Sequence, residues 1–316
     1  MYDVAFTVMD LEERGWVREN RSGETSQQRR GRGDAETQGM EILDKISFTQ
    51  GGQRNLGNAF LNTYLEQTGD WEGLPVLPLY LSRQAYVRGK VTSFLIDDPA
   101  IPQQAKQEAM ATASKYYRLA WEYSKIHQGR LFLMSGLSGS GKTTVARQLA
   151  RHLGAIHLRT DAVRKQLAGI PLEQRGGKEL YTEAMSQKTY DRLLELGIML
   201  ANEGLTVILD GKYDRQNLRG KAIQQANEHQ LPLQIIHCTA PESVLRDRLT
   251  ARTGDISDAT ADLLQSQQAA AEPFTDAEQS LVTTLDTTRD WLSFYVSNLP
   301  VFTDAETRRH GDAERD

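Results

Sequence analysis

The residues best suited to chemistry form one glycine-rich run, Gly136–Thr143, which reads GLSGSGKT. It matches the pattern G-x-x-x-x-G-K-[ST], in which glycines let successive backbone N–H groups turn towards phosphate oxygens. The charge of Lys142 suits β- and γ-phosphates, and the hydroxyl of Thr143 suits a magnesium ion. The run therefore predicts a loop that binds ATP with Mg²⁺. Its expected contacts are Gly136, Leu137, Ser138, Gly139, Ser140, Gly141, Lys142, Thr143 and Thr144.

A second candidate site follows the next expected strand, where Asp161 and Arg164 stand three residues apart. In parallel α/β folds the functional groups gather at the carboxyl ends of the strands, so both side chains should lie near the γ-phosphate. A carboxylate there could accept the proton of an acceptor hydroxyl, and a guanidinium could stabilise charge. The alternative is that Asp161 only caps the helix that follows it.

A third candidate, Asp210, ends the apolar run Thr206–Asp210 and is followed by Gly211. An aspartate at the end of such a strand commonly supports the water shell of a magnesium ion. Asp210 therefore joins Thr143 as a predicted metal residue. The alternative is an ordinary Asp-Gly turn.

Two arginines, Arg248 and Arg252, are four residues apart on an expected helix, so they project from one face of it. Arginines on a mobile segment can close over a triphosphate and neutralise charge in the transition state. We therefore expect a lid here, and these arginines join Lys142, Asp161 and Arg164 as catalytic candidates. The alternative is a solvated helix surface.

Alternating strands and helices are expected to position these groups. Five short apolar runs read as strands, and helical periodicity falls between each pair, which is typical of a parallel three-layer α/β domain. With the glycine-rich loop after the first strand, the pattern predicts a P-loop NTPase fold over residues 129–303. The strands are expected at Leu131–Ser135, Ala155–Leu158, Thr206–Asp210, Leu233–Cys238 and Leu281–Asp286.

The first 128 residues read as an all-helical region that precedes this domain. Within it, the segment at about 15–53 is rich in Arg, Glu, Gln, Ser and Gly and cannot bury enough apolar area to order itself, so we expect a flexible insertion. Residues 304–316 read as a polar tail. Helices are expected at 1–13, Asn55–Gly69, Leu79–Phe94 and Gln103–Ile126.

Composition limits the class of protein and its partners. The chain of 316 residues has 39% hydrophobic residues, enough for a core, and its net charge of −5 disfavours a protein that coats nucleic acid. No run of about 18 apolar residues and no basic leader is present, so we expect a cytoplasmic protein without a membrane partner. The single cysteine, Cys238, excludes an internal disulfide and is expected to be a buried bystander.

The motifs together resemble the small P-loop kinases, the group of AAA-type ATP-binding proteins that includes gluconate kinase, adenylylsulfate kinase, polynucleotide 5′-hydroxyl kinase and the zeta toxins. The resemblance implies that Asp161 activates the acceptor hydroxyl and that Arg164 contacts the acceptor. Such relatives often place a small residue and a hydroxyl residue after the third-strand aspartate, whereas here Gly211 and Lys212 follow. The resemblance is carried by Gly136–Thr143, Thr160–Arg164 and Val207–Asp210 within about residues 128–301.

The whole chain is also similar to a bacterial fusion of an aminoglycoside-phosphotransferase-like region with a C-terminal P-loop kinase. The stretch Asn58–Tyr80 carries this second resemblance, since it is similar to the helical lobe of the first part. It implies that residues 1–128 are a truncated phosphotransferase lobe without its catalytic loop. We therefore expect this region to dock or stabilise and to catalyse nothing.

Three functional classes stay open. A kinase that moves the γ-phosphoryl group of ATP to a hydroxyl of a small-molecule or nucleotide acceptor is favoured, because Asp161 with Arg164 suits an acceptor. A nucleic-acid 5′-hydroxyl kinase would need a basic channel that leads to Asp161. An ATP-hydrolysing switch that binds a partner protein would need a water-positioning residue instead.

Overall fold

The computed structural model describes residues 1–298 apart from 2, 6, 10–55, 175, 252–255 and 257–263. The predicted insertion at about 15–53, the predicted tail at 304–316 and the lid candidate Arg252 lie outside the described residues.

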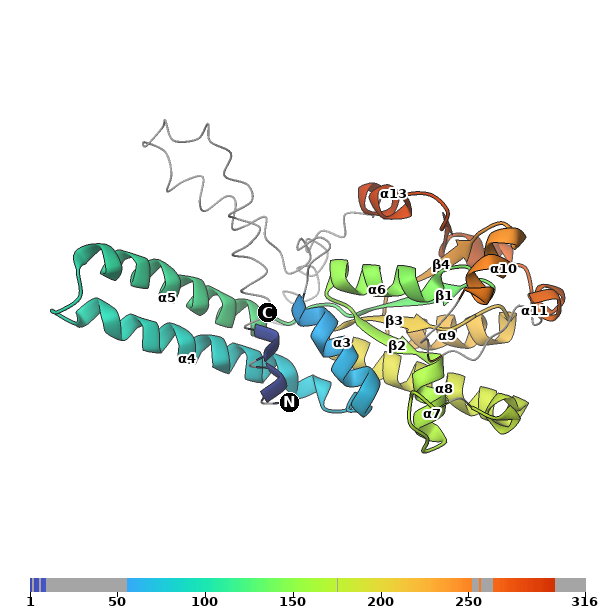
Figure 1. Ribbon diagram of the computed structural model, residues 1–316, viewed down its shortest axis with the longest axis horizontal. Coiled ribbons are helices and arrows are strands. Elements are labelled where there is room, and N and C mark those ends of the chain that lie inside the picture. Colours follow the sequence, from blue (N-terminus) through green and yellow to red (C-terminus); the bar gives the residue numbers. More distant parts are fainter. Residues whose placement is uncertain are drawn as a thin grey trace, which may run out of the picture.

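A five-stranded parallel sheet forms the centre of the structure, with the strand order β2-β3-β1-β4-β5 (Figure 1). All five expected strands are confirmed, each within one residue at either end. The order puts β1 in the middle, between β3 and β4, so that the carboxyl ends of these three strands meet at one edge. The strands are β1 (Arg130–Ser135), β2 (Ile156–Arg159), β3 (Thr206–Asp210), β4 (Leu233–Thr239) and β5 (Val282–Asp286).

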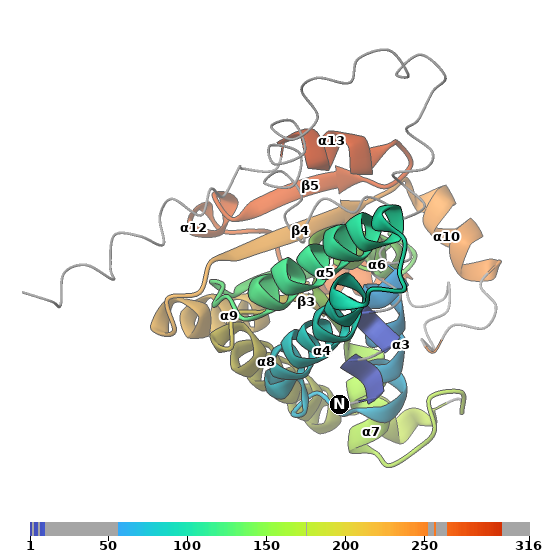
Figure 2. The ribbon, with the colours of Figure 1, turned by 90° about the vertical axis from the view of Figure 1, so that its left-hand side faces the viewer.

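Helices cover both faces of this sheet, which confirms the three-layer α/β architecture (Figures 1 and 2). Successive side chains of a strand point to opposite faces, and β1 shows it: Leu131 and Leu133 pack in one apolar cluster, while Phe132 and Met134 pack in another. The helices are α6 (Lys142–Leu153), α7 (Thr160–Leu167), α8 (Glu183–Asn202), α9 (Gln216–Glu228), α10 (Glu242–Thr250), α11 (Leu264–Ala270), α12 (Asp276–Gln279) and α13 (Trp291–Asn298), with a 3₁₀ turn at Lys178–Tyr181.

The region before β1 is helical in its described parts, as expected. Residues 3–5 and 7–9 are helical, and their apolar residues Val4, Ala5, Val8 and Met9 are buried. Helix α3 spans Leu56–Thr68 and is followed by Gly69 at φ 70°, the left-handed position that ends many helices. A short 3₁₀ turn, Leu74–Val76, then leads into two long helices.

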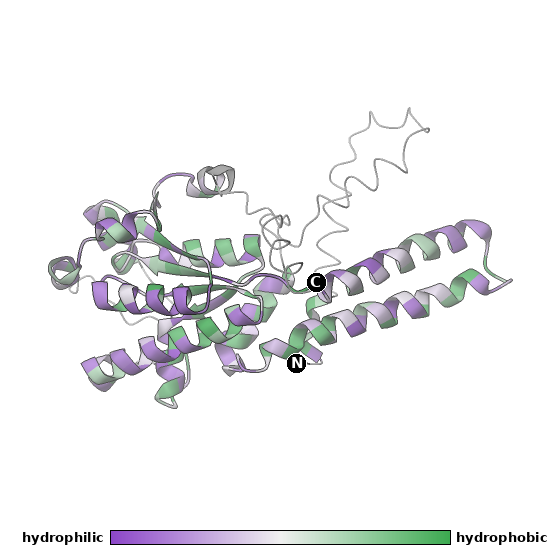
Figure 3. Ribbon diagram, turned by 180° about the vertical axis from the view of Figure 1, so that it is seen from behind, coloured by the Kyte–Doolittle hydropathy of each residue, from purple (hydrophilic) through white to green (hydrophobic). Residues whose placement is uncertain are grey.

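Helices α4 (Leu77–Asp97) and α5 (Gln103–Tyr123) form a hairpin that projects from the rest of the protein (Figure 1). Helix α4 begins two residues before the expected start at Leu79, because Pro78 lies in the first helical turn, where its missing N–H costs nothing. Green and purple residues alternate along both helices in Figure 3, and several large apolar side chains are exposed. Within the described residues no helix is long and apolar enough to cross a membrane.

Helix α3 lies against β2, the strand at one edge of the sheet. The side-chain amides of Asn58 and Asn62 both donate to the carbonyl oxygen of Ala155, at 2.9 and 3.0 Å. The backbone N–H of His157 in turn donates to Oδ1 of Asn62 at 2.7 Å. An exposed strand edge offers unpaired backbone groups to other chains. The two asparagines satisfy one such group of β2, the N–H of His157, and the carbonyl of Ala155 just before the strand.

Candidate functional site

The glycine-rich loop joins β1 to α6 in a conformation that requires glycine. Gly136 has φ 132° and Gly141 has φ 87°, values that side chains with a Cβ rarely adopt. A Cβ on Gly136 would also lie 2.3 Å from the carbonyl oxygen of Cys238. Gly141 stands directly before the first residue of α6, so the loop leads into a helix N-terminus, which favours anions. The strand–loop–helix context of a phosphate-binding loop is thus present.

The single cysteine lies beneath this loop, on β4. Its side chain is buried, and burial raises the pKa of Cys238 to about 12. The thiol therefore stays protonated at neutral pH and is no nucleophile. Its expected role as a buried bystander fits this position.

Lys142 turns its charge into the loop itself. Its Nζ donates to the carbonyl oxygens of Gly136 at 2.8 Å and Leu137 at 2.7 Å. Burial lowers the pKa of Lys142, and the negative charge of Asp210 opposes that effect. An anion at the loop would give the ammonium a stronger partner than two carbonyls.

The two predicted metal residues lie together at the end of β3. Asp210 is hydrogen-bonded to the hydroxyl of Thr143. Burial alone would raise the pKa of Asp210, but a hydrogen bond from His157 at 3.0 Å and the charge of Arg159 bring it down to about 2. The carboxylate is therefore ionised throughout the neutral range.

This pair fits a magnesium ion. No cluster of three or more His, Cys, Asp or Glu side chains that could hold a metal exists among the described residues. Mg²⁺ does not need one, because it usually keeps several waters and binds through one or two protein oxygens and the substrate phosphates. One hydroxyl and one ionised carboxylate beside the phosphate loop suit that preference.

Helix α3 reaches the same site through a second carboxylate. Glu66 accepts a hydrogen bond from Nη1 of Arg159 at 2.7 Å, and Nε of Arg159 lies 3.9 Å from Oδ2 of Asp210. The contacts of Arg159 with Glu66 and Asp210 thus link the helical region to the predicted metal carboxylate. Sequence reasoning missed them. The signal was a polar stripe of Asn58, Asn62 and Glu66, each four residues from the next on one face of α3.

The predicted acceptor pair is also assembled. Nη1 of Arg164 donates to Oδ1 of Asp161 at 3.0 Å, and the guanidinium lies over the ring of Tyr181, 5.0 Å from its centroid. Arg164 is buried, yet its Nε has no hydrogen-bond partner. The N-cap of α7 is Arg159, which places Asp161 in the first helical turn, where a negative charge is favourable.

One cavity of about 1290 Å³ joins these groups. The phosphate loop forms one part of its wall and the acceptor pair another, so both candidate sites open into the same space. Its walls include Lys142, Thr143, Asp161, Arg164, Asp210 and Arg248.

The arginine candidate Arg248 lies against the outer side of the loop. It donates to Oγ1 of Thr287 at 2.8 Å, to the carbonyl oxygen of Thr287 at 3.0 Å and to that of Gly139 at 3.4 Å. The Thr287 hydroxyl donates to the carbonyl oxygen of Ser140 at 2.9 Å. Arg248 is therefore fixed to the loop and to the segment after β5 in this structure.

The third loop residue has a partner that sequence reasoning did not find. The backbone N–H of Ser138 donates to Oε1 of Gln267, on α11, at 3.1 Å. The amide oxygen takes up a donor of the kind that a phosphate oxygen would use. Nothing in the residue types around Gln267 signals this contact.

The parallel sheet with its phosphate loop between β1 and α6 defines the class: a P-loop NTPase fold. Residues 131–274 match the family model described as an AAA domain. The chain is 32% identical over 216 residues to "uncharacterized protein Rv2004c" of Mycobacterium tuberculosis, over 67% of this chain and 42% of the relative. It thus spans less than half the length of this relative.

Two kinases are also among the similar proteins. A shikimate kinase of Dechloromonas aromatica is 38% identical over 85 residues, which cover 26% of this chain and 46% of that enzyme. Among solved structures, a sugar kinase from Janibacter sp. HTCC2649 is similar with 23% sequence identity and a TM-score of 0.40, over 54% of this chain and 91% of that one.

Proposed function

We propose that this protein is an ATP-dependent phosphotransferase that moves the γ-phosphoryl group of ATP to a hydroxyl of a small-molecule or nucleotide acceptor. The observation that carries the proposal is the shared cavity, in which Asp161 and Arg164 face the same space as Lys142 and Thr143. The similarity of part of the chain to a shikimate kinase supports a transfer to an acceptor.

In this proposal Lys142 leaves the two loop carbonyls and binds the β- and γ-phosphates. Thr143 and Asp210 would hold a magnesium ion, which neutralises charge on the phosphates when bound. Asp161 accepts the proton of the acceptor hydroxyl as its oxygen forms a bond to the γ-phosphorus. The bond from that phosphorus to the bridging oxygen breaks, and ADP leaves with the electron pair.

Arg164 then has two functions in the proposal. Its bond to Asp161 orients the carboxylate, and its unpaired Nε remains able to donate to the acceptor. Arg248 neutralises phosphate charge from the side of the loop, and Arg252 is proposed to join it there. The second candidate, a nucleic-acid 5′-hydroxyl kinase, uses the same groups and differs only in its acceptor.

We further propose that the helical region is a remnant of a phosphotransferase lobe that takes no part in the chemistry. The boundary near residue 128 then separates a supporting region from the kinase domain at 129–303. In support, the described helices α4 and α5 contribute no residue to the cavity wall, whereas α3 contributes Glu66 and Gln67, for which we propose a supporting role through Arg159.

A screen of ADP release across hydroxyl metabolites, nucleosides and 5′-hydroxyl oligonucleotides tests the proposal. Release should depend on one acceptor class and should fall roughly 10²–10⁴-fold in Asp161→Asn, the range expected for loss of a general base. Asp191→Asn serves as a matched control, since Asp191 is a half-exposed carboxylate on α8. ADP release that needs no acceptor and is unchanged in Asp161→Asn would favour a hydrolytic switch and refute the proposal.

A further inference from the structure

The loop after β3 departs from the pattern of the resembling kinases at Lys212, and the structure fixes the backbone of this residue firmly. The N–H of Lys212 donates to the hydroxyl of Tyr190 at 3.1 Å. Its carbonyl oxygen accepts from the N–H of Gly136, the first glycine of the phosphate loop, at 3.3 Å. The main chain of Lys212 is therefore tied to the phosphate loop on one side and to α8 on the other.

Gly211, the residue before Lys212, lies in a narrow gap between two side chains. A Cβ on Gly211 would lie 3.0 Å from Cγ2 of Thr160 and 3.0 Å from a ring carbon of Tyr190. The residue after Asp210 must therefore be small for the loop to pass between α7 and α8. Lys212 is then the first residue of the loop with room for a side chain, and it forms part of the cavity wall.

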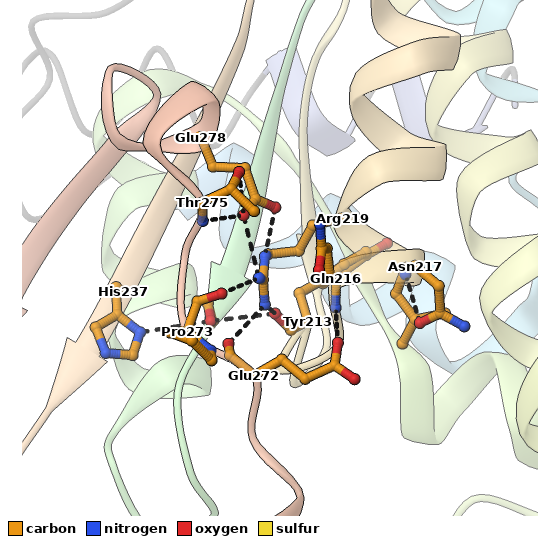
Figure 4. A network of polar contacts seen from close by, with 11 residues as sticks. Tyr213, Gln216, Asn217, Arg219, His237, Glu272, Pro273, Thr275 and Glu278 are labelled. Atoms are coloured by element: carbon orange, nitrogen blue, oxygen red, sulfur yellow. Dashed lines mark hydrogen bonds and ion pairs between the residues drawn. The ribbon is translucent and has the colours of Figure 1, made fainter.

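The following residue is strained and strongly held. Tyr213 has φ 39°, a value that costs about 1–3 kcal/mol for such a residue. Its ring packs edge-on against Tyr190, 5.3 Å between centroids, and its carbonyl oxygen accepts from Oγ of Ser135 at 3.3 Å. Nη1 of Arg219 donates to the same carbonyl oxygen at 3.3 Å (Figure 4).

Arg219 makes this support rigid. It is fully buried, and its guanidinium binds Glu278 through Nε at 2.7 Å and Nη2 at 3.1 Å (Figure 4). It also donates to the carbonyl oxygens of Glu272 and Pro273, at 3.3 and 2.9 Å. Removing one partner of a buried ion pair with this many hydrogen bonds strongly destabilises a protein. The pair of Arg219 and Glu278 therefore holds the loop in one position.

The backbone of Lys212 is thus held in place, whereas its side chain is free to change its contact. Its Nζ lies 3.1 Å from Oδ2 of Asp214, and the lysine side chain is 37% exposed while that of Asp214 is 8% exposed. The Oδ2 atom makes no hydrogen bond, so the contact is an ion pair without the alignment of a good donor. Lys142 and Lys212 both form part of the wall of the same cavity.

Two ammonium groups beside one phosphate loop need an anion between them. Without nucleotide, Asp214 supplies negative charge beside Lys212, and Asp210 lines the same cavity as both lysines. A triphosphate brings more negative charge to the same place and offers oxygens that bind ammonium groups well. Lys212 can then exchange its poorly aligned ion pair for a phosphate oxygen.

We propose that Lys212 is a second phosphate lysine, whose ammonium leaves Asp214 to bind the γ-phosphoryl group together with Lys142. Asp214 holds it ready when no triphosphate is present. The inference rests on the proposed function for the identity of the transferred group, but its first consequence concerns binding alone. Lys212 should distinguish ATP from ADP, because only ATP carries the γ-phosphate.

Titration calorimetry on the full chain, with Mg²⁺ and either ADP or a non-hydrolysable ATP analogue, tests this. Lys212→Met should weaken binding of the analogue about tenfold or more, the size expected for a lost charge-assisted hydrogen bond, and should leave ADP affinity within about twofold. Lys212→Arg should retain most of the preference. Lys221→Met is the matched control, since Lys221 lies on α9 and pairs with Asp191.

The variant Asp214→Asn distinguishes two roles of Lys212: binding phosphate, or forming a structural ion pair with Asp214. If Asp214 only holds the ammonium of Lys212 when no triphosphate is bound, the ATP analogue should bind Asp214→Asn equally well or a few-fold more tightly. This gain in affinity should vanish in the double variant with Lys212→Met. Equal losses for ADP and the analogue in Lys212→Met, no loss for either, or a loss in Asp214→Asn like that in Lys212→Met would each overturn the proposal. Failure of the acceptor screen alone would leave this binding result intact.

Discussion

Helix α3 and the α4–α5 hairpin come from the same helical region, yet they relate to the sheet in opposite ways. Polar side chains of α3 satisfy the edge of β2, and Glu66 reaches the site through Arg159. The hairpin helices pack mainly on each other, and Phe94 and Trp121 remain 63% and 65% exposed. A helix that precedes a domain in sequence belongs to its site only when it satisfies polar groups of that domain, as α3 does and the hairpin does not.

The largest difference should appear when the asparagines of α3 are removed. The double variant Asn58→Leu with Asn62→Leu leaves the carbonyl of Ala155 and the N–H of His157 without these partners. Each buried unpaired group costs about 1–3 kcal/mol, so urea unfolding should show a loss of about 2–6 kcal/mol. Gln104→Leu on the hairpin should cost far less, because Gln104 bonds only to the exposed Glu108. Equal losses in the two variants would contradict this difference between α3 and the hairpin.

Acid titration should show how strongly His157 and Arg159, on the strand that α3 covers, stabilise the carboxylate of Asp210. The pKa of Asp210 is about 2 in the folded protein against 3.8 for the free group, a stabilisation of roughly 2 kcal/mol. Because the folded value is the lower one, this stability is present above about pH 4 and is lost as the pH falls towards 2. The difference in unfolding free energy between the natural protein and Asp210→Asn should shrink over that range. A constant difference would contradict this.

Shortening the hairpin should have little effect on the site. Replacing residues 90–112 by a short Gly-Ser linker removes the projecting ends of α4 and α5 but none of the described cavity wall. Nucleotide affinity by calorimetry should stay within about twofold, since opening or loss of a segment with few contacts to the core need not reach the rest of the fold. A tenfold change in nucleotide affinity would show that the hairpin, like α3, supports the site.

The smallest effect is expected at the hairpin surface. Trp121→Gln replaces a 65% exposed side chain on α5, so the unfolding free energy should change by no more than about 0.5 kcal/mol. Light scattering should show less self-association, because an exposed apolar side chain is lost. A loss of several kcal/mol would mean that Trp121 packs against something in solution.

The fold could be predicted well because its strands are short apolar runs that stand between helical periodicities. The run Thr206–Asp210 is a strand with the same bounds in the structure. The strand order could not be predicted, because the buried runs of β3 and β4 present similar apolar patterns to either neighbour. The edge contact of α3 was missed since asparagines on a helix surface are also common where they face only water.

The placement of the candidate residues around one cavity could be predicted where one motif dictates both residue type and backbone, while their roles stay predictions. Lys142 and Thr143 follow directly from the loop, and Asp161 and Asp210 from the ends of their strands. Contacts between segments that are far apart in the sequence could not be predicted from a local motif. Gln267 meets Ser138 across more than a hundred residues, and no local pattern marks the pairing of Lys212 with Asp214.

The position of Cys238 makes this protein a convenient subject for thiol labelling. It is the only cysteine of the sequence, it is 1% exposed, and burial raises its pKa to about 12. A maleimide dye should therefore ignore the folded natural chain and react with a cysteine placed at Ile126, which is 96% exposed. The native thiol would become reactive only on unfolding, so the same chain carries its own chemical reporter of the folded state.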